Sequence, residues 1–184
     1  MLYHSHRTMP LPDLPMPSTK AMKGGRRLPT VVIDSREQAP LPITRLTHVR
    51  AGLATGDYSV LGLEDTVAIE RKSLDDLAQC CGNDRDRFER ELQRMMAYRV
   101  RALVIEGTVE DINMRCYRSQ IEPKCITGSL LAWRVRYGIE PHFFRERDVA
   151  ARWVERECWL AAREAVRAWN RLATGIRKGA ACES

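Results

Sequence analysis

Short apolar runs along this chain change from strand-like to helix-like spacing, and this change is the strongest constraint on its fold. Residues 30–34 (TVVID), 57–61 (DYSVL) and 66–70 (TVAIE) have the length and pattern of strands, and GLED at residues 62–65 is a typical hairpin turn. After Ser73 the apolar residues recur at helical spacing. Strands that pair through a hairpin and then alternate with helices predict an α/β fold, with helices flanking a mixed sheet.

The rest of the chain supplies the other elements of this predicted fold. A short helix is expected at residues 43–53, a buried strand at residues 100–106 and a last strand at residues 139–144. One long helix is predicted from residue 148 to residue 173, where Gly175 is placed to stop it. The predicted apolar faces of the helices are Phe88, Leu92, Met95 and Met96; Ile126, Leu130, Trp133 and Tyr137; and Val154, Cys158, Ala161, Ala165, Trp169 and Leu172.

The length of 184 residues suits one domain with a hydrophobic core and is too short for two comfortable ones. Residues 1–29 contain several prolines, few large apolar residues and a basic end, which predicts a disordered basic tail. The domain is therefore expected to span residues 30–175, followed by a short C-terminal tail at residues 176–184.

The composition also predicts where the protein works. No segment has the length and apolarity of a membrane span, and the first residues contain no apolar core of signal-peptide length. The six cysteines form no CxxC pair, which favours reduced thiols. We therefore expect a soluble, cytoplasmic or otherwise intracellular protein. A net charge of +6 favours a polyanionic partner such as nucleic acid, although it also serves solubility.

Residues 56–76 (GDYSVLGLEDTVAIERKSLDD) gather the groups that phosphodiester hydrolysis requires. The alternation of a strand places Glu70 and Lys72 on one face and Arg71 on the other. Asp57, at the start of the preceding strand, can meet Glu70 across the hairpin. Carboxylates bind Mg²⁺ through hard oxygen ligands, and a nearby ammonium can stabilise developing charge. Taken alone, the same pattern also fits solvated residues on the exposed face of a hairpin.

The order of these motifs resembles the nuclease domain of the XPF family of structure-specific endonucleases, a branch of the PD-(D/E)xK, restriction-endonuclease-like superfamily. The resemblance covers about residues 30–145. The family signature is Gly-Asp, then Glu-Arg-Lys, three residues and Asp. It is matched by Gly56-Asp57, Glu70-Arg71-Lys72 and Asp76. Further matches are VVIDSRE with Asp34, Arg36 and Glu37; DRFERE with Arg87; and ALVIEG, an apolar strand that ends in Glu.

The resemblance implies a fold, an activity and a site. The fold is a restriction-endonuclease-like mixed sheet, and the activity is Mg²⁺- or Mn²⁺-dependent cleavage of branched, flap or fork DNA, as in DNA repair and recombination. Asp57 and Glu70 would be metal ligands, with Asp34 as a third acid nearby. Lys72 would orient the attacking water and stabilise the pentavalent phosphorus. The site residues assigned to DNA binding are Arg36, Arg71 and Arg87, and those of second rank are Glu37 and Asp76.

Several alternatives remain open at this stage. Arg71 either contacts phosphate or pairs with Asp76 to lock the strand to the next helix. Arg87 either reaches a phosphate or lies on a solvated helix face. His48 and His142 lack the spacing of metal ligands, so a zinc site is not expected.

The function itself has rivals. A non-catalytic, DNA-binding partner subunit is one, and a module that binds protein or RNA through its basic surface is another. Family members usually carry a tandem helix-hairpin-helix module after the nuclease domain. The residues that follow PHFF instead predict one helix, so an unidentified protein is a candidate for targeting. The wide apolar surface of that helix, with Trp153 and Trp159 outside its main stripe, or the helix around Trp133, is expected to form a homodimer.

Overall fold

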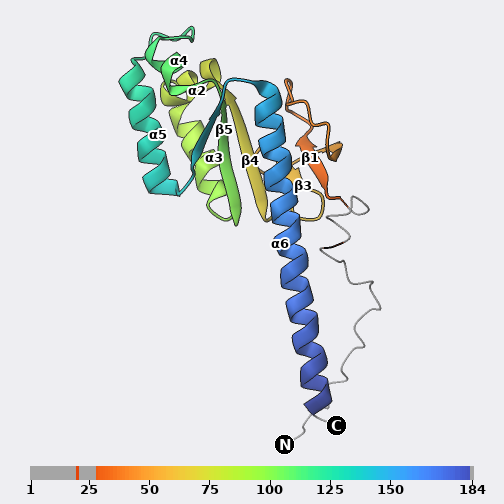
Figure 1. Cartoon of the computed structure of the whole chain (residues 1–184). Helices are drawn as coiled ribbons and strands as arrows, with labels where there is room; N and C mark the ends of the chain where they lie inside the picture. Colours follow the sequence, from red (N-terminus) through yellow and green to blue (C-terminus); the bar gives the residue numbers. More distant parts are fainter. Residues whose placement is uncertain (1–19, 21–27, 183–184) are drawn as a thin grey trace, which may run out of the picture.

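The structure, a computed structural model, describes residue 20 and residues 28–182. Within these residues the strands form one six-stranded mixed sheet of order β2-β1-β3-β4-β5-β6 (Figure 1). The strands are β1 Thr30–Asp34, β2 Thr47–Ala51, β3 Tyr58–Val60, β4 Val67–Ser73, β5 Val100–Glu106 and β6 Pro141–Phe144. The helices are α2 Leu74–Cys81, α3 Arg85–Met95, α4 Val109–Asn113, α5 Pro123–Tyr137 and α6 Arg147–Cys182. Most of the predicted tail at residues 1–29 lies outside the described residues.

Helices cover both faces of the sheet, which confirms the predicted α/β fold. Helices α2, α3 and α5 lie on one side and α6 crosses the other (Figure 1). A hydrophobic core lies on each face of the sheet, and strand β4 contributes to both. Ala68 packs on the α2 side, while Val67 and Ile69 pack on the α6 side. None of the helices in the described part is long and apolar enough to cross a membrane.

The antiparallel centre of the sheet fixes the register of the acidic residues. Tyr58 of β3 lies opposite Ile69 of β4, so one residue further on Asp57 lies opposite Glu70 on the other face of the sheet. The amide of Asp57 donates to the carbonyl of Ile69 at 2.8 Å, and the amide of Asp34 donates to the carbonyl of Asp57 at 2.8 Å. The ends of β1, β3 and β4 therefore bring Asp34, Asp57 and Glu70 to neighbouring positions of the sheet.

Two expectations about secondary structure were wrong in the first half of the chain. Residues 47–51 form strand β2, parallel to β1, and not part of a helix. All five side chains of this edge strand are exposed, so it lacks the apolar alternation by which a strand is recognised. Met96 was expected on the buried face of α3, but it caps the end of that helix and is exposed.

The last helix was also predicted too short. Helix α6 continues through Gly175 to Cys182, and no heavy atom lies within 4 Å of the position that a Cβ at Gly175 would take. A glycine inside a helix costs only about 1 kcal/mol relative to alanine, which the good helix formers around it can offset. The 36 residues of α6 correspond to about 54 Å, and its distal half extends beyond the sheet (Figure 1). Leu172, which was predicted on the buried stripe, is therefore exposed.

A single glutamate of α6 holds the connection between β1 and β2. Parallel strands are usually joined through a helix, but residues 35–46 contain none. The carboxylate of Glu155, which is 3% exposed, accepts hydrogen bonds through Oε1 from the amides of Thr44, Arg45 and Leu46 at 2.5–3.1 Å. This side chain therefore replaces the missing helix as the anchor of the crossover.

Replacing Glu155 with alanine should lower the free energy of unfolding by about 2–4 kcal/mol, because buried amides left without an acceptor cost about 1–3 kcal/mol each and the loop can relax only in part. Urea unfolding measures the effect. Glu164→Ala is the control on the same helix, since its ion pairs with Arg163 and Arg167 are partly exposed and exposed pairs contribute about 0–1 kcal/mol. Equal losses in the two variants would contradict the anchoring role.

Candidate active site

Three of the predicted catalytic side chains meet on the α2 and α3 side of the sheet. Glu70 and Lys72 lie one pleat apart on β4, and Lys72 Nζ forms an ion pair with Glu70 Oε1. The ammonium also lies over the ring of Phe88, 5.2 Å from its centroid. Asp57 is held beside them, because its Oδ2 accepts from the amide of Arg71 at 2.7 Å.

Glu70 is buried and Asp57 half-buried, and this partial loss of water decides the pKa values of both acids. Burial, and then the charge of Glu70, raises the pKa of Asp57 from 3.8 to about 7. Burial also raises the pKa of Glu70, against the opposing effect of Lys72. Burial would lower the pKa of Lys72, but the attraction of Glu70 and Asp57 outweighs it, so the pKa is raised and the ammonium stays charged. The two carboxylates therefore repel each other in a site of low polarity, and a cation bound between them would relieve this repulsion.

This donor set fits Mg²⁺ or Mn²⁺. Both ions prefer oxygen ligands, and Mg²⁺ usually keeps several waters while it binds one or two carboxylates. Within the described residues, no group of three or more His, Cys, Asp or Glu side chains is placed to hold a metal ion. Asp57 and Glu70 are thus the side chains available as ligands, and water would complete the coordination.

Asp34 is engaged differently from the pair. Its Oδ1 accepts from the amide and Nε of Arg36 at 2.7 and 2.8 Å, and its Oδ2 accepts from the second guanidinium nitrogen of Arg36 and from the amide of Leu53, both at 2.8 Å. The hydrogen bond from Arg36 is the main cause that lowers the pKa of Asp34 to about 2. Both oxygens of this acid, expected as a third metal ligand, are therefore taken by donors. Asp34 fixes Arg36, whose side chain remains 72% exposed at the rim.

Arg71 does not pair with Asp76 as one alternative predicted. Strand alternation points Arg71 to the face of β4 opposite α2. On that face Arg71 pairs with Glu37 and Glu106, each at 2.9 Å, and its side chain is only 10% exposed. Asp76 instead forms a capping box with Ser73 at the start of α2. The charge network continues from Glu106 to Arg147 of α6 at 2.6 Å. Arg71 therefore ties the loop after β1 to the ends of β4 and β5, and it offers little surface to a ligand.

Arg87 and Glu37 complete the predicted set. The side chain of Arg87 is 74% exposed on α3, with an ion pair to Asp84 at 2.9 Å. Burial would raise the pKa of Glu37, but its hydrogen bond to Arg71 lowers it. Glu37 is therefore a charged, buried partner of Arg71, while Arg87 is exposed near the start of α3.

Glu91 was missed by the sequence analysis although it ends the DRFERE motif. It accepts hydrogen bonds from the hydroxyl of Thr55 and the amide of Gly56, and its charge contributes to the raised pKa of Glu70. The available signal was its spacing of three from Phe88, which places it on the same helix face.

Gly56 has a φ of 77°, and a Cβ there would lie 3.1–3.2 Å from the backbone of Ile69. This close approach explains the glycine that precedes Asp57.

Comparisons with known proteins identify a matching family and similar folds. The family model of the ERCC4 domain matches residues 33–156. Similar solved structures include XPF from Aeropyrum pernix, with 23% identity, a TM-score of 0.59 and coverage of 77% of this chain and 70% of that one. XPF from Aeropyrum pernix in complex with DNA has 22% identity, a TM-score of 0.60 and coverage of 74% and 66%. A comparison with curated protein sequences finds no match.

At these identities the structural likeness is evidence for the fold, whereas the family match rests on the sequence. The matched residues make up more than half of the chain and run from β1 into α6. They contain Asp57, Glu70 and Lys72 together with the network around Arg71. The chain therefore belongs to the ERCC4 domain family of structure-specific DNA nucleases, and its fold is that of an XPF nuclease domain.

Proposed function

We propose that this protein is an Mg²⁺- or Mn²⁺-dependent endonuclease that hydrolyses phosphodiester bonds in branched, flap or fork DNA. The observation that carries the proposal is the pair of half-buried Asp57 and buried Glu70, with Lys72 in contact with Glu70, at the end of a hairpin in an ERCC4 domain. Two neighbouring acids, one buried and one half-buried, that repel each other are unfavourable for folding alone, so their presence favours a functional role. DNA as substrate would place the protein inside the cell, at the nucleoid in a prokaryotic or viral setting.

In this mechanism each side chain has a separate task. Asp57 and Glu70 would hold the metal ion, which when bound supplies Lewis-acid polarisation of the phosphate and of the attacking water. Lys72 stays charged because of its acidic neighbours, so it can orient the water and stabilise the negative charge of the transition state. The product end would carry a 5′ phosphate.

The rim residues would position the DNA. Arg36 is exposed and rigidly held by the fork to Asp34, so it is suited to contact a phosphate. Arg87 is exposed at the start of α3 on the same side. Arg71 is assigned to the structural network on the opposite face. DNA contacts of this type set affinity and register and do not read base sequence.

The rival interpretations leave this arrangement unexplained. A non-catalytic partner subunit has no need of Asp57, Glu70 and Lys72 together, and the chain keeps all three in contact or electrostatic coupling. A module that binds protein or RNA through surface charge has no need of buried acids.

A homodimer is proposed through α5 and the edge strand β6. Leu131 and Val135 lie one helical turn apart on the outer face of α5 and are 61% and 86% exposed. Strand β6 is the last strand of the sheet, so one edge of its backbone is open within the described residues. A second copy would cover both features and double the basic surface available to branched DNA.

Asp57→Asn and Glu70→Gln should each reduce cleavage of labelled flap or fork DNA at least 100-fold, because either change removes a negative charge that holds the metal. Binding to the same DNA should change little. Gel cleavage and binding assays on one preparation measure both. Asp65→Asn is the matched control, since this exposed acid lies in the turn of the same hairpin. Wild-type rates in either site variant would contradict the assignment.

In metal-free buffer Asp57→Asn should raise the free energy of unfolding above about pH 7, by at most about 4 kcal/mol. The pKa of Asp57 rises from 3.8 in the unfolded chain to about 7 in the folded protein. Between these two pH values the folded protein binds more protons than the unfolded chain, so wild-type stability falls as the pH increases from about 4 to about 7. The variant should not show this fall. Urea unfolding between about pH 4 and pH 8 tests the difference, and parallel profiles would refute it.

The same assay with Mg²⁺ separates the ligands from the lysine. The ion should stabilise wild type and Lys72→Ala, but neither Asp57→Asn nor Glu70→Gln, because an ammonium cannot be a metal ligand.

Light scattering at micromolar concentration should give about twice the 21.1 kDa of one chain. Val135→Glu should lower the mass toward one chain, because it places a charge in the proposed interface. Leu61→Glu, a change at an exposed leucine in the hairpin turn, should leave the mass unchanged. A wild-type mass of one chain would exclude the dimer.

A further inference from the structure

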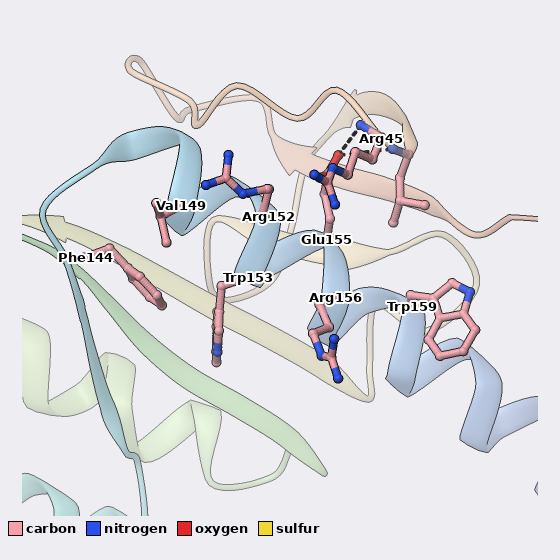
Figure 2. A pocket seen from close by; sticks show the side chains of 9 residues that line it. Arg45, Phe144, Val149, Arg152, Trp153, Glu155, Arg156 and Trp159 are labelled. Carbon is pink, nitrogen blue, oxygen red and sulfur yellow. Dashed lines mark hydrogen bonds between the residues drawn. The ribbon is translucent and has the colours of Figure 1, made fainter.

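A groove on the α6 side of the molecule combines aromatic rings with arginines (Figure 2). It has a volume of about 490 Å³ and lies between the start of β2, the end of β6 and the first turns of α6. It belongs to the face of the sheet opposite Asp57 and Glu70, so it is separate from the candidate active site. The residues that matter for its chemistry are Arg45, Arg152, Arg156, Phe144, Trp153 and Trp159.

The three arginines of the groove differ from most others in the chain. Arg45, Arg152 and Arg156 are exposed, and none of them forms an ion pair within the described residues, whereas thirteen other arginines do. Arg152 and Arg156 are one helical turn apart, a spacing at which like charges repel. The fold gains nothing from this cluster, but a chain of phosphates would neutralise it.

The aromatic rings beside the arginines are fixed and half-buried. Trp153 packs against His142 and Phe144, with ring centroids at 4.3 and 5.7 Å. The ring of Trp159 is covered on one side by the guanidinium of Arg163, 5.0 Å from the centroid. Both indoles still line the groove. Rings that are held in place in this way can stack unpaired bases without losing side-chain freedom, and stacking tolerates any base.

Glu155 supplies an observation independent of the surface charge. Its Oε1 holds the amide of Arg45, which fixes one arginine at the groove (Figure 2). Its Oε2 is buried and has no hydrogen-bond partner within the described part of the chain. A buried acceptor of this kind calls for a donor. Glu155 therefore forms part of the groove wall, with one carboxylate oxygen that no protein group in the described residues satisfies.

We propose that this groove binds a single-stranded segment of DNA, with phosphates on the arginines and bases stacked on Trp153 and Trp159. The identity of the strand, the unpaired arm of a branched substrate, rests on the proposed function. A second copy of the chain is disfavoured as occupant, because a two-fold axis through the groove would bring Arg45, Arg152 and Arg156 against their own counterparts.

The test uses the full chain carrying Asp57→Asn, so that DNA is not cut during titration. Binding of a single-stranded oligonucleotide is followed by anisotropy across a salt series. Arg152→Gln with Arg156→Gln should weaken binding at least tenfold at low salt and reduce the slope of log K against log salt by about 1.4, since each phosphate contact contributes about 0.7. Arg171→Gln should change neither, because Arg171 is an exposed arginine on the same helix that lies outside the groove and forms no ion pair with the residues that the structure describes.

The tryptophans give a second, distinct signature. Trp153→Leu and Trp159→Leu should each weaken binding about 5- to 100-fold with the salt slope unchanged, because stacking releases no counterions. Circular dichroism confirms that each variant is folded. Binding by the double arginine variant that equals wild type at every salt concentration would overturn the proposal. Tighter binding of RNA than of DNA of the same sequence would also overturn it. So would a double arginine variant whose mass by light scattering falls while its affinity for DNA is unchanged.

Cleavage assays with Asp57 restored separate this proposal from the function itself. The double arginine variant should cut a flap with a long unpaired arm more slowly than wild type, and should cut a nicked duplex without such an arm at the wild-type rate. If wild type cuts nothing while binding still depends on the arginines, the proposed function fails and the groove stands. If cleavage is normal and the arginines have no effect on either DNA, the groove assignment fails.

Discussion

The guanidinium of Arg71, held between Glu37 and Glu106, is the interaction on which the rest of the structure depends. It joins three segments that are distant in sequence: the loop after β1 and the ends of β4 and β5. Through Glu106 the network reaches Arg147, which also donates to the carbonyls of Ala39 and Pro40. Removal of one partner from a buried charge network is strongly destabilising, because the remaining charges lose their compensation. The ends of the central strands are therefore fixed before any substrate arrives.

Strand alternation makes this network and the acid pair inseparable. Glu70 and Lys72 point to one face of β4 and Arg71 to the other, so three consecutive residues are divided between the candidate site and the supporting charge network. The same backbone that is pinned by Arg71 holds Asp57, whose carboxylate accepts from the amide of Arg71. A shift of β4 by one residue would exchange the two faces and lose both arrangements at once. The repulsion between Asp57 and Glu70 can persist because the opposite face is so firmly held.

Much of this arrangement was predictable because it follows from local periodicity. The hairpin and the buried strands each have a pattern that a few neighbouring residues determine. Strand β2 escaped prediction because an exposed edge strand has no apolar alternation. Glu91, Glu106 and Glu155 escaped for another reason. A glutamate on an amphipathic helix or at a strand end is usually solvated, and only the assembled fold reveals that these three carboxylates meet amides, hydroxyls and guanidinium groups.

The crossover held by Glu155 links the order of synthesis to the order of folding. Residues 35–46 leave the ribosome early, but their anchors, Arg147 and Glu155, belong to the segment made much later. A nascent chain that has not reached residue 155 cannot fasten the loop that carries Arg36 and Glu37. The hairpin with the acid pair can form while its rim and its supporting charges are still missing. A nascent chain that ends before residue 155 therefore lacks two of the side chains that support its candidate site, or at least the second of them, Glu155.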